Sequence, residues 1–133
     1  MNCLSGYIEG LSGTGNLTLV KVNIGGTVFN SIVIGNTENS AYLATGKSVN
    51  LLFDESEVMI GKNISGKLSI GNVANCRVIS IEKGNVFTRL GLDLHGNTVY
   101  SLITCEAQKE LNIAVHDKVE MYVKMNEIFL QYP

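Results

Sequence analysis

Apolar and polar residues alternate along short segments of this chain, which is the pattern of strands with one buried face. The clearest case is residues 86–94, where the positions of one phase are Val86, Thr88, Leu90, Leu92 and Leu94. His95-Gly96 follows, and a second such segment runs over residues 98–104. Gly25-Gly26 stands at the equivalent place in the first half, and glycine permits the positive φ that a two-residue hairpin requires. Both pairs therefore predict hairpin turns.

The whole pattern occurs twice, at a constant offset of 70 residues. A few residues are identical at this offset, among them the pairs Asn2/Asn72, Thr18/Thr88 and Ser31/Ser101. Many more positions keep their apolar character, including Ile8/Val78, Val20/Leu90, Val22/Leu92, Ile24/Leu94, Leu51/Met121 and Val58/Ile128. A chance alignment would not keep so many core positions in phase, so the chain is an internal duplication.

Each half then predicts five short strands. Residues 106–111 predict one short helical turn in the second half, matched by residues 38–43 in the first, and strands at 118–124 and 127–130 close the second unit. Five strands with one helical turn are typical of an OB-like β-barrel. We expect an all-β protein of two tandem five-stranded barrels, residues 1–62 and 66–133, joined through a linker at residues 61–66.

Composition narrows the function. Hydrophobic residues make up 45% of the chain and charged residues 17%, so we expect a partner chain to cover part of the surface in a homo-oligomer, a dimer or trimer. A net charge of −2 argues against direct nucleic-acid binding, which favours a basic surface. No apolar stretch approaches the ~20 residues of a membrane span, and the first ten residues lack the pattern of a signal peptide. Three cysteines without a CxxC spacing fit reduced thiols, and we expect a cytoplasmic protein.

Short segments that resemble catalytic or metal-binding motifs lack the residues or the secondary structure that those motifs require. Gly46-Lys47-Ser48 resembles the end of a phosphate-binding loop, but the first glycine of that motif would fall on Ala41 and residues 49–53 predict a strand. His95 and His116 are isolated, and no cluster of cysteine, histidine and carboxylate has the spacing of a metal site. The sequence therefore predicts a protein that is not an enzyme, with no cofactor and no metal.

Several short motifs resemble a known repeat. The second half opens with Leu68-Ser69-Ile70-Gly71-Asn72, continues with residues 81–84 (IEKG) and 102–104 (LIT), and closes with Val123-Lys124. The first half keeps residues 2–6 (NCLSG) and 53–58 (FDESEV). This series resembles the Mop or TOBE molybdate-binding repeat, whose pattern opens Leu-Ser-Ala-Arg-Asn, continues through an Ile-Thr-x-x-Ser element and ends in a lysine-containing strand. The resemblance covers essentially the whole chain and implies a tandem di-Mop fold.

Three departures from the family pattern bear on ligand binding. Gly71 replaces the opening arginine, and Ala107 replaces the serine after Ile-Thr, a position that is Thr37 in the first half. Asp54 stands in the first half where the family has its closing lysine, and a carboxylate there would repel an oxyanion. We therefore expect the first-half site to be degenerate and the second half to carry the binding.

The resemblance implies a tetrahedral dianion as ligand. Molybdate and tungstate offer only acceptor oxygens, so a site must supply backbone N–H groups, hydroxyls and cations. We expect the oxyanion to lie near the opening motif of the second half, with two further residues contributed from a neighbouring chain. The predicted site residues are Ser69, Ile70, Gly71, Asn72, Thr104 and Lys124.

Two functions remain open. The first is a molybdate or tungstate carrier, store or sensor in molybdenum homeostasis or transport, with a molybdate transporter component as a further partner. The chain is too short for an added DNA-binding or ATPase domain, so we expect a free-standing protein or a fragment. The alternative is a regulator-derived interaction or oligomerisation module that has lost oxyanion binding, and the missing arginine at Gly71 keeps it open.

Overall fold

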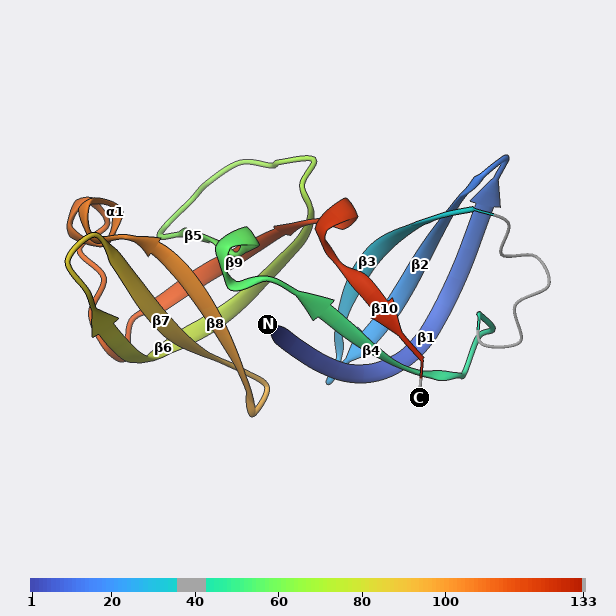
Figure 1. The fold of residues 1–133 in the computed structure, drawn as a ribbon, viewed down its shortest axis with the longest axis horizontal. Helices are drawn as coiled ribbons and strands as arrows, with labels where there is room; N and C mark the ends of the chain where they lie inside the picture. Colours follow the sequence, from blue (N-terminus) through green and yellow to red (C-terminus); the bar gives the residue numbers. More distant parts are fainter. Residues whose placement is uncertain (36–42, 133) are drawn as a thin grey trace.

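The computed structural model describes residues 1–35 and 43–132, and it consists mainly of strands arranged in two lobes that lie side by side (Figure 1). The first half contains β1 (Asn2–Thr14), β2 (Leu17–Ile24), β3 (Thr27–Ile34), β4 (Ser48–Phe53), the 3-10 turn η1 (Glu55–Glu57) and β5 (Met59–Gly61). The second half contains β6 (Gly71–Lys83), β7 (Phe87–Leu94), β8 (Asn97–Thr104), helix α1 (Cys105–Glu110), β9 (Lys118–Lys124), η2 (Met125–Glu127) and β10 (Phe129–Gln131). The expected β fold is confirmed as two five-stranded, OB-like antiparallel sheets.

The two halves share fine details at the offset of 70. Both long strands, β1 and β6, have an irregularity in their register, between Ile8 and Gly10 and between Val78 and Ser80. Both predicted hairpins are present, and each of the four turn residues has a positive φ, with His95 at 52°. Such a turn matches the twist of the flanking strands, so the duplication extends to the backbone geometry.

Two expected elements need comment. Helix α1 occupies almost the residues predicted for it, but its first-half counterpart at residues 38–43 lies outside the described residues except for Leu43. The strand expected at residues 127–130 was placed too early. Glu127 ends the 3-10 turn η2, and β10 begins only at Phe129, because this turn redirects the chain before it can pair.

The last strand of each half belongs to the sheet of the other half. β10 pairs with β4, in the order β10-β4-β1-β2-β3, and β5 pairs with β9, in the order β5-β9-β6-β7-β8. The registers are equivalent, since Met59 lies opposite Tyr122 and Phe129 lies opposite Leu52. In Figure 1 the red strand β10 accordingly lies in the lobe of the blue strands. The two repeats are thus linked by exchanged strands.

Buried apolar side chains from both halves form a single core cluster. The fully buried ones of largest volume are Phe29, Phe53, Leu4, Ile8, Ile24, Leu51, Leu90, Leu92, Leu94, Met121, Ile128 and Val20. Val58 and Ile128, which directly precede the exchanged strands, are each 1% exposed. Burial of these side chains holds each exchanged strand in the opposite lobe. Among the described residues, no helix is long and apolar enough to cross a membrane.

The three cysteines lie in different environments, which predicts different reactivities. Cys3 is exposed, whereas Cys76 is buried with its Sγ 3.6 Å from the carbonyl oxygen of Val119. Burial raises the pKa of the Cys76 thiol to about 12, so roughly one molecule in ten thousand would carry the thiolate at pH 8. We expect an aromatic disulfide reagent to modify Cys3 rapidly in the native protein and Cys76 only after denaturation. Equal rates at the two cysteines, measured by mass spectrometry of peptides, would contradict this assignment.

Candidate functional site

The structure brings Gly71 and Lys124 together at the start of the second repeat. They are direct partners in the antiparallel ladder of β6 and β9, the first residue of one strand and the last of the other. Lys124 is exposed, and its side chain makes no hydrogen bond or ion pair with any other described residue. An ammonium group with free donors therefore stands beside Gly71, which itself carries no side chain and is packed by Met125.

Asn72 is buried and holds the neighbouring repeat. Its Oδ1 accepts the backbone N–H of Asn30 at 2.6 Å, and its Nδ2 donates to the carbonyl of Asn30 at 2.9 Å. Only 2% of Asn72 is exposed, so its amide is directed to this contact and away from solvent. Asn72 acts as a positioning residue that fixes β3 of the first repeat against β6 of the second.

Two residues of the first repeat complete the arrangement. The side chain of Asn30 donates to the carbonyl of Gly71 at 3.0 Å, and Lys21 donates to Oδ1 of Asn30 at 2.8 Å. The structure thus connects a lysine of the first repeat to the strand end that carries a lysine of the second. We call this set the junction site; it comprises Lys21, Asn30, Gly71, Asn72 and Lys124.

The backbone at Gly71 explains the absence of the family's arginine. Its φ is +95°, and a Cβ built there would collide with the side chain of Met125. An L-residue at this position is therefore strained and sterically blocked. With the arginine excluded, the cationic groups left at the junction site are the ammonium groups of Lys21 and Lys124.

Of the remaining predicted site residues, Ser69 and Ile70 adjoin this cluster in the chain, whereas Thr104 lies away from it. Ser69 and Ile70 form the turn that leads into β6, and Ser69 is exposed. Thr104 ends β8 opposite Phe87, near the far end of β6. β6 has 13 residues, about 40 Å of extended chain. The Thr104 hydroxyl accepts the N–H of Ala107 at 3.0 Å and caps α1, so within one chain it does not reach Gly71.

The equivalent positions of the first repeat are built differently. Asn2 repeats the contacts of Asn72, because its amide binds the backbone N–H and carbonyl of Tyr100 at 2.8 and 2.9 Å. Asp54, the counterpart of Lys124, caps η1 by accepting the N–H and hydroxyl of Ser56. These bonds lower the pKa of Asp54, so the first repeat presents a carboxylate where the second presents an ammonium group.

Lys21 and Asn30 were missed by the sequence interpretation. Both lie in the first repeat, and motif spacing within the second repeat says nothing about residues that reach it from elsewhere. One signal was present in the sequence: Asn2 and Asn72 are identical at the offset of 70. The structure shows that both are buried, at 3% and 2% exposed, and a buried asparagine needs hydrogen-bond partners, which the other repeat supplies.

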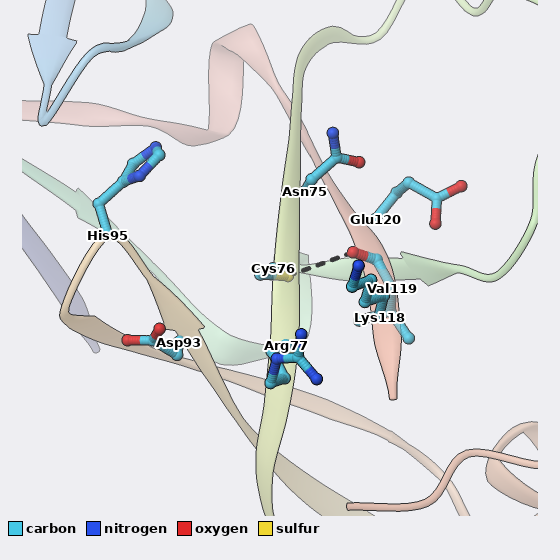
Figure 2. A pocket seen from close by; sticks show the side chains of 8 residues that line it. All are labelled: Asn75, Cys76, Arg77, Asp93, His95, Lys118, Val119 and Glu120. Atoms are coloured by element: carbon cyan, nitrogen blue, oxygen red, sulfur yellow. Dashed lines mark hydrogen bonds between the residues drawn. The ribbon is translucent and has the colours of Figure 1, made fainter. Parts of the chain in front are cut away.

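A hollow with a volume of about 500 Å³ lies elsewhere, on the second sheet. Figure 2 shows the side chains that surround it, which come from β6, β7, β9 and the turn at His95: Asn75, Cys76, Arg77, Asp93, His95, Lys118, Val119 and Glu120. Two cations stand beside two carboxylates, so the hollow has no excess of positive charge. For a dianion, the junction site is the better candidate of the two.

Comparisons with known proteins bear on the family and the fold. The family model described as the TOBE domain matches residues 68–130. Among solved structures, the cytoplasmic molybdate-binding protein ModG, in a crystal form with molybdate bound, is similar to the chain with a TM-score of 0.92. Identity is 25%, and the match covers 99% of this chain and 96% of that one. No curated protein sequence matches the chain.

Proposed function

We propose that this chain, whose residues 68–130 match the TOBE-domain model, binds molybdate, with tungstate as an alternative ligand of the same shape and charge. The observation that carries the proposal is the similarity, over nearly the full length of both chains, to a protein crystallised with molybdate bound. Binding without catalysis suits a cytoplasmic carrier, store or sensor in molybdenum homeostasis or transport.

We place the oxyanion at the junction site, next to the turn formed by Ser69 and Ile70. Lys124 supplies a free ammonium group, and Lys21 supplies a second cation from the other repeat. A tetrahedral dianion is stabilised by such charge-assisted donors together with backbone N–H groups. Thr104 contributes only from a neighbouring chain, because its own chain holds it at the opposite end of β6.

We further propose a di-Mop arrangement that assembles into a homo-oligomer, a dimer or trimer. Exposed apolar side chains occur at equivalent positions of the two repeats: Leu17 and Phe87 are 48% and 54% exposed, and Met59 and Phe129 are 56% and 60% exposed. Repeated exposed apolar residues of this kind favour contact with another protein surface. A component of a molybdate transporter is a further partner of this class.

Replacing Lys124 by alanine tests the placement. Loss of one charge-assisted hydrogen bond costs about 1.5–3 kcal/mol, a loss in affinity of about 10- to 200-fold. We expect calorimetric titration with molybdate and tungstate to show this loss in Lys124→Ala, and sulfate to serve as the comparison anion. Asp54→Ala should leave the wild-type affinity almost unchanged.

Lys118→Ala is the matched control, because Lys118 is also an exposed lysine of β9 but lies at its other end, beside the hollow of Figure 2. A loss of affinity in Lys118→Ala and none in Lys124→Ala would move the site to that hollow. No binding of either anion at millimolar concentration would favour the interaction-module function instead.

A further inference from the structure

The chain contains a second position whose backbone arrangement is equivalent to that of the junction site. At the offset of 70, residues 1–2 and 54–55 correspond to residues 71–72 and 124–125. In both places a buried asparagine holds the backbone of a β-strand from the other repeat, β8 in one case and β3 in the other. The duplication has therefore produced two equivalent positions where the repeats meet.

The two positions differ in what fills them. At the junction site the counterpart of Glu55 is Met125, whose side chain lies against Gly71. At the second position Glu55 is an ion: Arg89 donates from Nε to its Oε1 at 2.9 Å and from Nη2 to its Oε2 at 3.2 Å. The Arg89 guanidinium also lies over the ring of Tyr100, 3.6 Å from the centroid.

A guanidinium held in this way has the geometry of an anion-binding site, and the carboxylate of Glu55 already occupies the place of the anion. Two parallel N–H donors match two oxygens of a carboxylate, and they match two oxygens of a tetrahedral oxyanion equally well. The stacking on Tyr100 fixes the plane of the fork, and the side chain of Glu55 is 22% exposed, so the pair is open to solvent at one edge. The hydrogen bond from Arg89 also lowers the pKa of Glu55, which keeps the carboxylate ionised at neutral pH.

We propose that Arg89 and Tyr100 form a second, latent oxyanion site, and that the carboxylate of Glu55 closes it by occupying the anion's place. The inference rests on the oxyanion function proposed above. It accounts for the difference between the repeats: one leaves the ammonium group of Lys124 open to a ligand, and the other pairs the guanidinium of Arg89 with an internal carboxylate. Each chain then binds one oxyanion through its own open site, although the duplication supplies two positions.

Removal of the internal carboxylate tests the inference. In Glu55→Ala, calorimetric titration with molybdate should give one additional bound anion per chain compared with the wild type. The same titration of the double variant Glu55→Ala with Arg89→Ala should return to the wild-type stoichiometry. The guanidinium fork of the latent site is then gone, and the N-terminal ammonium group, 3.8 Å from Oε2 of Glu55 in the wild type, does not replace its two parallel donors.

Glu57→Ala is the matched control. Glu57 lies in the same 3-10 turn and is exposed, and its side chain makes no hydrogen bond or ion pair with a described residue. Its removal therefore changes the net charge equally without freeing Arg89. Its stoichiometry should equal that of the wild type. Where circular dichroism shows that Glu55→Ala is unfolded, Glu55→Gln replaces it, since the amide keeps the shape and removes the charge.

The outcomes separate this inference from the function on which it rests. An unchanged stoichiometry in folded Glu55→Ala overturns the latent site, whatever the wild type binds. A gain that persists after Arg89 is removed also overturns it. An additional anion in Glu55→Ala when the wild type binds none would support the latent site while contradicting the open junction site.

Discussion

Asn72→Ala is expected to lower the free energy of unfolding by about 2–4 kcal/mol. The substitution removes two hydrogen bonds and leaves the N–H and carbonyl of Asn30 without their partners between the repeats. Each lost bond costs about 1–1.5 kcal/mol net, and burial of an unsatisfied group adds to that cost. Equilibrium unfolding in urea measures the change as a lower midpoint with an unchanged slope.

Two further variants give this measurement its controls. Asn75→Ala alters an exposed asparagine of the same strand whose side chain makes no hydrogen bond with another described residue, so its stability should stay within about 0.5 kcal/mol of the wild type. Asn2→Ala should be destabilised by an amount similar to Asn72→Ala, because its two bonds to Tyr100 repeat the same arrangement. A normal stability in Asn72→Ala would show that the repeats are held together by the exchanged strands alone.

The alternation of apolar residues predicted the buried faces of the strands well. Leu90, Leu92 and Leu94 are all at most 1% exposed, and Thr88 of the same phase is fully buried. Val86 continues the phase but is 61% exposed, because it precedes the first residue of β7. Periodicity reports which face of a strand is buried and becomes uninformative where pairing ends.

The exchange of β5 and β10 could not be predicted from the sequence. The two segments are equivalent at the offset of 70, so each has the pattern needed to pair with either β4 or β9. The choice depends on the direction in which η1 and η2 turn the chain, which no hydrophobic pattern encodes. For the same reason Asn30 and Lys21 escaped notice, since both reach the junction site from the other repeat.

The structure was also needed to show what the departures from the family pattern mean for the site. In the sequence, Gly71 shows only that the family's arginine is missing. In the structure, its positive φ and the packing of Met125 show that a side chain at this position would be strained and would collide with Met125. The carboxylate of Asp54 is visible in the sequence, whereas the ion pair between Glu55 and Arg89 joins residues 34 positions apart. No motif spans that distance.

A fragment of residues 66–133 is expected to be unfolded as a monomer and to fold as a dimer with exchanged strands. In the full chain β9 pairs with β5, and the hydroxyl of Ser101 donates to the carbonyl of Val58 at 2.6 Å. The fragment lacks both β5 and Val58. The equivalents it retains are β10 and Ile128, whose carbonyl accepts from Ser31 in the full chain. A second copy can supply them, because the registers of the two exchanged strands are the same.

Light scattering and thermal unfolding at several concentrations measure this directly. The fragment should have the mass of a dimer at high concentration, and its Tm should fall on dilution because folding is coupled to association. A shorter fragment, residues 66–126, lacks β10 and should show no cooperative transition at any concentration. A unit of about 65 residues has a marginal core even when complete, and the loss of one strand of five exposes apolar side chains that nothing else in the fragment covers. A 66–133 fragment that stays folded and monomeric at the lowest concentration would mean that β10 can fold back onto its own β9.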